Sequence, residues 1–251
     1  MTPISATIIT FNEEKNIARC IDSVKPVADD IVVVDSFSTD ATERICLEKK
    51  VRFIRHAFEG HIEQKNWAVT QAEYPHVFSL DADEALDVVL QQSILAVKEQ
   101  WRFDGYFVNR FNNYCGRWIR HSGWYPDRKL RLWDSRKGAW EGENPHDRFE
   151  MQPDATTGRL KGNLLHYSYA DITEHIEQIH KFSTIAAQAR FKKGKQISTP
   201  MIVMRSWLIF WKKYFLKRGI LDGYHGYVIS MLTAYATFLK DIKLRELNKR
   251  K

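Results

Sequence analysis

The chain has 251 residues, 44% of them hydrophobic, so it is long and apolar enough to fold around a full core. Its three cysteines lack a C-x-x-C pair, which argues against a disulfide scaffold or zinc ribbon and fits a reducing cytosol. The formal charge of +7 is uneven: residues 1–180 carry 22 Lys and Arg against 28 Asp and Glu, whereas residues 181–251 carry 16 against 3. The basic region therefore requires an anionic partner, either nucleic acid or an anionic membrane surface.

The start of the chain does not resemble a secretory signal. The apolar run at residues 4–11 is short, lacks a basic segment before it and meets Asn12, Glu13 and Glu14 at once. We therefore expect the protein to stay on the cytoplasmic side of the membrane.

The first hundred residues alternate short β-branched runs with amphipathic stretches. This alternation is typical of βαβ units around a parallel sheet, in which ligands bind outside the carboxyl ends of the strands. We therefore expect a doubly wound half whose functional residues lie where each strand stops. The predicted strands are residues 6–10, 31–34, 51–54 and 77–80.

Two helices are expected between the first three strands. Asn12 is positioned to cap the first helix, with Glu13 and Glu14 in its first turn. Residues 38–40 are expected to open the second helix, which ends at residues 49–50. The apolar residues spaced to cover one face of the first helix are Ile17, Cys20, Ile21 and Val24.

The pattern changes from residue 105 onward. Short strands are predicted at residues 106–110 and 129–133, separated by loops rich in Trp, Arg, His and Asn. This is expected of an α+β half that places an acceptor site against the nucleotide half. A purely structural β region is the alternative.

The tripeptide Asp81-Ala82-Asp83 follows an apolar strand, so its two carboxylates leave the strand end on the same side. A hard divalent cation such as Mg²⁺ or Mn²⁺ takes oxygen ligands from one or two carboxylates and fills its other positions with phosphate oxygens and water. Two acids after a strand are more often a helix cap with a solvated neighbour. The position at the end of the fourth strand favours a metal site for a diphosphate.

Other polar residues border the same predicted crevice. Asp35 follows the second strand and is able to accept from a base N–H or a ribose hydroxyl, or alternatively only starts a turn with Ser36. Thr10 and Asn12 lie at the end of the first strand. Lys65 is expected to begin a helix and to add a positive charge to the phosphates, although an isolated lysine is more often surface decoration.

The segment at residues 118–125 combines flat aromatic faces with cations, and Arg117 precedes it. Arginine pairs with phosphate and aromatic rings stack on sugars, so a phosphorylated sugar acceptor suits this segment. Ordinary core tryptophans are the alternative explanation.

The C-terminal region combines bulky apolar residues at helical spacing with interleaved Lys and Arg over residues 202–218, and an uncharged stretch follows at 223–239. A membrane-spanning helix needs roughly 20 apolar residues, and this stretch includes Ser230, Thr233 and three tyrosines. An interfacial amphipathic pair bound to anionic lipid heads is therefore favoured, with a helical cap on the catalytic domain as the alternative. Nucleic acid is disfavoured, because no zinc pattern, RNP-like motif or helix-turn-helix accompanies the charge.

Four ordered motifs resemble those of glycosyltransferase family 2, the inverting enzymes of the GT-A fold. They lie at residues 8–14 (IITFNEE), 32–36 (VVVDS), 64–66 (QKN) and 80–84 (LDADE), which covers about the first 110 residues in order and spacing. The resemblance implies a nucleoside-diphosphate sugar as donor. The residues it implies for donor binding are Thr10, Asn12, Glu14, Asp35, Lys65 and Asp81.

The fold that the resemblance implies is α/β, of the GT-A type. Residues 1–180 would form the catalytic domain, with a doubly wound, Rossmann-like nucleotide half at 1–110 and a mixed α+β acceptor half at 111–180. Residues 181–251 would form the basic, amphipathic helical region that associates with the membrane.

Later segments resemble one branch of this family, the lipopolysaccharide core β-1,4-glucosyltransferases that act on inner-core heptose. The segments are residues 129–133 (KLRLW), 145–147 (PHD), 165–168 (LHYS) and 216–223 (LKRGILDG). The resemblance implies transfer of a hexose, glucose from UDP-glucose, to a lipid-linked core oligosaccharide. The enzyme would then be peripheral, at the inner face of the cytoplasmic membrane.

The same resemblance implies roles for individual residues. Asp147 is the expected general base, although that branch usually has Glu at this position and the shorter side chain reaches less far. Glu141 and Glu143 are its rivals, with Glu143 ranked next, and a solvated loop acid is the alternative for either. The expected ligands of the divalent metal, Mg or Mn, are Asp81, Asp83 and His166, although a buried, hydrogen-bonded role explains His166 equally well. His166 is expected to follow a strand at residues 160–165. The expected acceptor-binding residues are Trp124, Arg128 and Arg131, and Arg131 or Lys65 is also able to assist the departing diphosphate.

Two other classes of function were compared with this one. A non-catalytic nucleotide-sugar or glycan-binding module docked on the membrane would share the same residues without turnover. A sugar-1-phosphate nucleotidyltransferase would share the doubly wound half but needs a Gly-rich loop with Arg and Lys after the first strand. Residues 10–14 (TFNEE) are not such a loop.

Overall fold

The computed structural model describes the backbone of residues 1–143 and 146–250, and the side chains of all of these except Glu143, His146 and Asp147. The chain forms two compact units. The first unit comprises residues 1–110 and 127–166, and the second comprises residues 111–126 and 167–251. The predicted boundary at residue 180 falls inside helix α5 (Ile172–Lys192), within the second unit.

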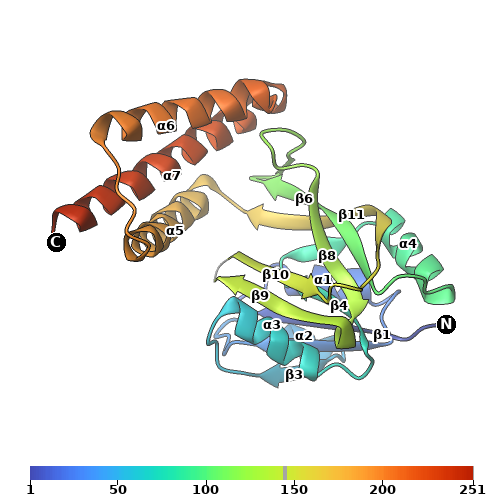
Figure 1. The fold of residues 1–251 in the computed structure, drawn as a ribbon. Helices are drawn as coiled ribbons and strands as arrows, with labels where there is room; N and C mark the ends of the chain where they lie inside the picture. The colour runs from blue at the N-terminus through green and yellow to red at the C-terminus, as the bar shows by residue number, and fades with distance from the viewer. Residues whose placement is uncertain (144–145, 251) are drawn as a thin grey trace. The chain divides into compact units, whose positions relative to one another are not determined.

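Four parallel strands begin the main sheet: β1 (Ile4–Thr10), β2 (Asp30–Asp35), β3 (Arg52–Arg55) and β4 (His76–Asp81). They lie in the order β3-β2-β1-β4. Figure 1 labels β1, β3 and β4 of this group. The four predicted strands are therefore confirmed, each within two residues of its expected ends. Their carboxyl ends share one edge of the sheet, as the doubly wound pattern predicts.

The sheet continues from β4 in antiparallel pairing. Strand β4 pairs with β8 (Asp127–Asp134), and β8 pairs with β6 (Gly105–Tyr114). The next strands are β11 (Thr157–Tyr169) and β5 (Glu84–Leu86), and the short β7 (Arg117–Trp118) pairs with the far end of β6. A separate antiparallel pair is formed by β9 (Gly138–Glu143) and β10 (His146–Met151). The predicted combination of a doubly wound half and a mixed half is confirmed.

Alternating side chains of the parallel strands pack on both faces of the sheet. Val33 of β2 lies in the core that α1 (Ile17–Val24) and α4 (Val88–Glu99) cover, whereas Val32 and Val34 pack against Ala68 of α3 (His61–Thr70). Helix α2 (Thr42–Glu48) adds Cys46 to the first of these layers. Helices on both faces explain why β2 is a continuous run of β-branched residues.

Helix α1 begins at Ile17, so the prediction that Asn12 caps it is wrong. Asn12 instead has a left-handed backbone (φ 54°), and its side-chain oxygen accepts the Thr39 N–H at 2.8 Å. Its own N–H donates to Ser38 Oγ at 2.7 Å. Asn12 therefore joins two loops at the sheet edge. The predicted buried face of α1 is confirmed, because all four of its apolar residues are fully buried.

Two other local predictions differ from the structure. Lys65 lies in the middle of α3 rather than at its start, because that helix already begins at His61. His166 lies within β11 rather than after it, since the strand continues to Tyr169. In both cases the predicted element type is right and its end is displaced, because neither boundary carries a strong capping or turn residue.

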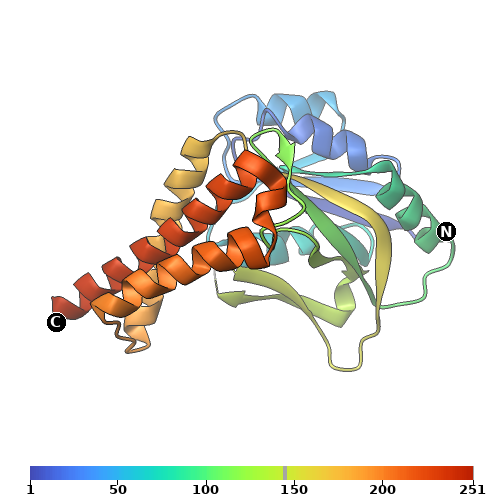
Figure 2. The same ribbon diagram turned by 90° about the horizontal axis from the view of Figure 1, so that it is seen from above.

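The second unit is dominated by three helices: α5, α6 (Thr199–Trp211) and α7 (Gly223–Lys249). Both α5 and α6 pack against α7 (Figure 2). A π-helical turn, η2 (Lys212–Leu216), and a 3₁₀ turn, η3 (Gly219–Asp222), connect α6 to α7. Across the described residues, none of the helices combines the length and apolar character needed to cross a membrane.

Gly162 of β11 lies in close contact with α4, and a substitution at this position tests the packing of β11 on α4. It has φ +89°, and a Cβ there would lie 2.2 Å from Leu90 N. Gly162→Ala should therefore cost more than the about 1–2 kcal/mol of a left-handed alanine alone. The free energy of unfolding, measured in urea, checks this.

Gly194→Ala is the matched control, because Gly194 also has a positive φ (+67°) but nothing lies within 4 Å of its Cβ position. Equal losses of stability in the two variants would contradict the crowding at Gly162.

Candidate functional site

The carboxyl ends of three parallel strands bring the predicted polar residues to one edge of the first unit. Thr10 is paired in register with Asp35, and Ile9 with Asp81. Thr10 and Asp35 are buried, whereas Asp81 is partly exposed. The strand ends predicted to form a nucleotide crevice thus lie side by side.

The residues around β1 and β2 hold two loops together. Asp35 accepts the Ser38 N–H at 2.8 Å, so its carboxylate organises the loop after β2. Glu14 accepts the Ala41 N–H at 3.0 Å, and its own N–H donates to Asp40. Together with Asn12, these residues shape the sheet edge. Their role in binding a nucleotide stays a prediction.

Asp81 lies between two cations. Its Oδ1 is 3.1 Å from Lys65 Nζ, and its Oδ2 is 3.1 Å from a guanidinium nitrogen of Arg131. Burial would raise the pKa of the Asp81 carboxyl, but the charges of Lys65 and Arg131 outweigh it and hold that pKa well below its usual range. Asp81 is therefore a carboxylate at neutral pH.

Glu84 was missed as a site residue by sequence reasoning. It is buried, and its Oε1 lies 2.8 Å from the Arg131 guanidinium and 4.0 Å from that of Arg110. Burial raises the pKa of the Glu84 carboxyl, and Arg131 only partly opposes this effect. The available sequence signal was weak: an acid that directly follows Asp81-Ala82-Asp83 and precedes two apolar residues.

Arg131, like Lys65, is a buried cation of this group. It lies on β8 and contacts both Asp81 and Glu84. It was predicted to bind the acceptor or to assist the diphosphate. The structure places it beside Asp81 and Glu84, and both roles stay predictions.

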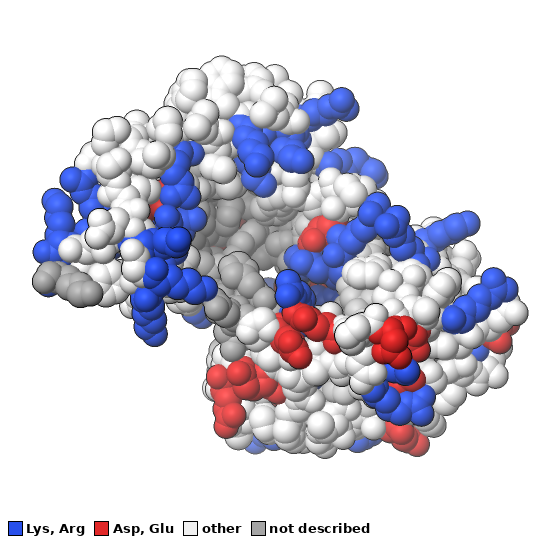
Figure 3. Space-filling view, in the orientation of Figure 1, with Lys and Arg blue, Asp and Glu red and all other residues white. Residues whose placement is uncertain are grey.

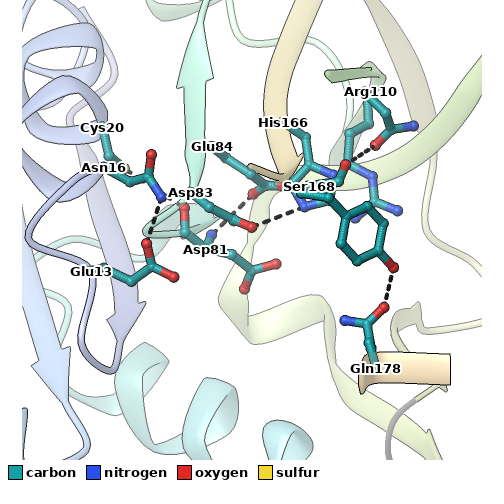
Figure 4. A network of polar contacts seen from close by, with 12 residues as sticks. Glu13, Asn16, Cys20, Asp81, Asp83, Glu84, Arg110, His166, Ser168 and Gln178 are labelled. Atoms are coloured by element: carbon teal, nitrogen blue, oxygen red, sulfur yellow. Dashed lines mark hydrogen bonds and ion pairs between the residues drawn. The ribbon is translucent and has the colours of Figure 1, made fainter. Parts of the chain in front are cut away.

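Asp83 and His166 form the second pair of the site. Asp83 Oδ2 is 3.1 Å from His166 Nε2, and the two side chains point toward one another (Figure 4). Burial alone would lower the pKa of His166, but the charge of Asp83 and the hydrogen bond to it outweigh burial and raise that pKa. A turn after β4 and the strand β11, 83 residues apart in the chain, thus meet at one point.

The donor set fits a divalent cation through two residues. Asp83 and His166 place one carboxylate oxygen and one imidazole nitrogen within reach of a single ion, and Mg²⁺ or Mn²⁺ commonly keeps phosphate and water in its other positions. Both oxygens of Asp81 already face cations. In the part of the chain that the structure describes, no group of three or more His, Cys, Asp or Glu is arranged to hold a metal. The metal stays a prediction.

The remaining predicted site residues are Arg128, Trp124, Asp147 and Glu143. Arg128 is exposed on β8. Trp124 belongs to the second unit, where its ring packs edge-on against Tyr114 at 5.6 Å. The side chains of Asp147 and Glu143 lie outside the described residues, although their backbones belong to β10 and β9.

Similarity to known proteins identifies the family of this chain. A family model for glycosyl transferase family 2 matches residues 5–152, which is more than half of the chain and includes the Asp-Ala-Asp motif and Arg131. The chain belongs to glycosyl transferase family 2. Membership of this family and the observed sheet together confirm the predicted α/β fold of the GT-A type.

This family 2 glycosyltransferase has relatives that match it almost end to end. An uncharacterized glycosyltransferase of Rickettsia typhi is 31% identical over 99% of this chain and 88% of its own length. The lipopolysaccharide core biosynthesis glycosyltransferase LpsC of Rhizobium meliloti is 29% identical over 96% of this chain and 92% of its own length. The similarity to LpsC confirms the resemblance to glycosyltransferases of the lipopolysaccharide core.

Solved structures similar to this glycosyltransferase were also found. TarS of S. aureus has a TM-score of 0.48 and 14% identity, over 99% of this chain and 92% of that chain. Glucosyl-3-phosphoglycerate synthase of Mycobacterium tuberculosis, solved with Mn²⁺, UDP and glucosyl-3-phosphoglycerate, has a TM-score of 0.38 and 22% identity, over 45% of this chain and 44% of that chain.

Arg131→Met tests the buried charge cluster. Removing the guanidinium leaves Asp81 and Glu84 without their shared cation, and breaking a buried ion pair costs about 3–5 kcal/mol. The free energy of unfolding should fall by that amount in chemical denaturation. Arg128→Met, an exposed position on the same strand, should change it by about 0.5 kcal/mol or less. Similar effects of both substitutions would contradict the cluster.

Asp83→Asn tests the second pair. The variant keeps His166 buried but removes the charge that raises its pKa, so the pKa of His166 should fall. Because the pKa of His166 is raised in the folded state, its protonation contributes its full stabilisation at pH values below the ordinary histidine pKa of about 6.5. That contribution is lost as the pH rises through the raised value. NMR titration of the imidazole resonances measures the pKa of His166 in the wild type and in the Asp83→Asn variant.

His175 is an internal control for this titration. Burial lowers its pKa to about 4, and it belongs to the other unit. A His166 pKa that is unchanged by Asp83→Asn would contradict the pairing.

Proposed function

We propose that this family 2 glycosyltransferase is an inverting hexosyltransferase that moves glucose from UDP-glucose to a heptose of the lipopolysaccharide inner core. The observation that carries the proposal is the cluster of Asp81, Asp83, Lys65, Arg131 and His166 at the carboxyl edge of the parallel strands. The relative LpsC, named for lipopolysaccharide core biosynthesis, supports the class of acceptor.

The cations of the cluster are suited to a diphosphate. Lys65 and Arg131 are both buried and both directed at Asp81, so their ammonium and guanidinium groups are held at the sheet edge before a substrate arrives. Positive groups fixed in advance stabilise charge that develops on a leaving group without reorganisation. In this proposal the positive charges of Lys65 and Arg131, which pair with Asp81, also stabilise the negative charge of the departing diphosphate.

Asp83 and His166 would hold the divalent metal, Mg or Mn. A bound divalent ion acts as a Lewis acid on phosphate oxygens and is typically worth several kcal/mol of charge stabilisation. In the proposal Asp81 keeps Lys65 and Arg131 in place beside that ion and does not itself need to be a ligand. In this proposal Asp81, predicted as a metal ligand together with Asp83, acts instead by holding Lys65 and Arg131.

Inversion at the sugar C1 needs a base on the acceptor hydroxyl, on the face opposite the leaving phosphate. We assign this role to Asp147 of β10, with Glu143 of β9 as the rival. The two belong to the same antiparallel pair, in which Asp147 is in register with Gly142 and Glu143 with His146. Either carboxylate would take the proton of the acceptor hydroxyl as its oxygen attacks C1.

The acceptor is proposed to be a lipid-linked core oligosaccharide at the inner face of the cytoplasmic membrane. Trp124 and Arg128 remain the proposed acceptor contacts, through ring stacking on a sugar and pairing with a phosphate. The net charge of +13 over residues 181–251 supports an anionic membrane surface as the place of work.

Turnover measured with the intact protein tests this function. With UDP-glucose, a heptose-terminated core acceptor and Mn²⁺, we expect glucose transfer with inversion at C1. Asp147→Asn should lower kcat by about 10²–10⁴-fold, because loss of a general base removes that much catalysis. Asp83→Asn should abolish the dependence on Mn²⁺ together with most of the transfer.

Glu143→Gln is the matched comparison for the base. A large loss in Glu143→Gln with little loss in Asp147→Asn would reassign the base. Binding of UDP-glucose without any turnover in the wild type would replace the proposed enzyme by a nucleotide-sugar-binding module.

A further inference from the structure

Helix α6 carries a row of large apolar side chains that the second unit leaves exposed. Trp207 is 59% exposed, and its neighbours one turn away along the helix are similarly open. The members of this row are Val203, Met204, Trp207, Leu208, Trp211 and, on the following turn, Phe215. We call these six residues the α6 face. An exposed apolar patch of this size marks an interaction site in a folded protein.

The α6 face is separate from the side of the helix that packs on α7. Ile202 is the one residue of α6 classed as buried. Arg205 is the only charged residue of the helix, and its guanidinium lies 3.1 Å from the buried carboxylate of Asp241 in α7. The single charge of α6 is therefore used inside the unit, and the α6 face is uncharged.

The apolar row is flanked by cations. Between residues 178 and 221 the sequence contains ten Lys and Arg and no Asp or Glu. Residues 192, 193 and 195 precede α6, and residues 212, 213, 217 and 218 follow it, all of them Lys or Arg. Figure 3 shows Lys and Arg over the visible side of helices α5 to α7, with almost no acidic atoms among them.

The cations after α6 are not neutralised within the described residues. Lys212, Lys213, Lys217 and Arg218 have no carboxylate partner in that part of the chain. Lys213 is half-buried. Its burial lowers the pKa of its ammonium group, and the nearby charges of Lys212 and Lys217 lower that pKa further. Positive charges gathered in this way are stabilised by an anion supplied from outside.

The turn between α6 and α7 adds further exposed apolar groups. Leu216 is 79% exposed and Leu221 is 59% exposed, and both lie within four residues of Lys217 and Arg218. Bulky apolar tips beside lysines are the composition of segments that sit in the headgroup layer of a membrane.

We propose that the α6 face and the turn after it form a membrane-docking surface for anionic phospholipids, with α6 lying in the plane of the interface. A helix of 13 residues is about 20 Å long, too short for the roughly 30 Å hydrocarbon core. The apolar row would enter the headgroup and acyl boundary, and the lysines at both ends would bind lipid phosphates. The surface deepens the membrane location of the proposed function and names its partner.

Two other occupants fit the same surface less well. A second copy of the chain would bring its own run of cations against these, because a twofold interface uses the same patch on both subunits. Nucleic acid would be bound through cations and stacked bases, and it gives no reason for exposed Val, Met and Leu.

Vesicle sedimentation tests the surface with the full chain. The wild type should bind vesicles of phosphatidylglycerol and phosphatidylcholine, bind pure phosphatidylcholine weakly, and lose affinity as salt is raised. Trp207→Ser with Leu208→Ser should weaken binding to the anionic vesicles at least tenfold. Lys212→Gln with Lys217→Gln should weaken binding and reduce its salt dependence.

Val88→Ser with Val89→Ser is the matched control, because these two apolar residues of α4 are equally exposed but belong to the first unit. Circular dichroism of every variant confirms folding. Unchanged vesicle binding in the Trp207 and Leu208 variant would overturn the proposal. So would a wild-type dimer in gel filtration that this variant converts to monomer, since a second copy would then be the occupant.

Glucose transfer to a water-soluble acceptor separates this inference from the proposed function. The Trp207 and Leu208 variant should retain wild-type transfer to that acceptor while losing vesicle binding. A wild type that binds anionic vesicles but transfers no sugar would contradict the proposed enzyme and leave the docking surface standing.

Discussion

The contact of Arg131 with Asp81 and Glu84 joins the two halves of the sheet in the first unit. Asp81 ends a parallel strand, whereas Arg131 comes from the antiparallel strand β8 beside it. A buried guanidinium with two carboxylates is costly to form and more costly to break, because removal of any partner leaves an uncompensated charge. The cluster therefore requires β4 and β8 to keep their register, and Lys65 of α3 contacts the same Asp81 carboxylate from another element.

This arrangement shows how much of the site was readable from the sequence. Strand ends are local features, so β-branched runs followed by polar residues were sufficient to predict Asp35 and Asp81 at one sheet edge. His166, the partner of Asp83, was proposed only through a family resemblance. The two residues are 83 positions apart in the chain, and no local sequence pattern predicts a contact over that separation. Glu84 was missed because a buried acid and a solvated acid look the same in a sequence until the cation opposite is known.

The differences in the helices have a similar origin. Asn12 has the composition of a helix cap, but its side chain is used by the loop at Thr39, a contact made 27 residues away. Local capping preferences are worth about 1 kcal/mol, which a pair of tertiary hydrogen bonds is able to outweigh. The buried face of α1 was nonetheless predicted residue by residue, because burial follows the helical period wherever the helix begins.

Asp241 determines which side of α6 faces outward. By its composition α6 is apolar almost all round, and such a helix has no preferred outward side of its own. The carboxylate of Asp241 binds Arg205 of α6 and Arg190 of α5, and so fixes the rotation of α6 about its own axis. The one-sidedness of α6 is then a property of the assembled helices and not of the helix sequence. A peptide with the sequence of α6 would lack the orientation that the folded unit imposes.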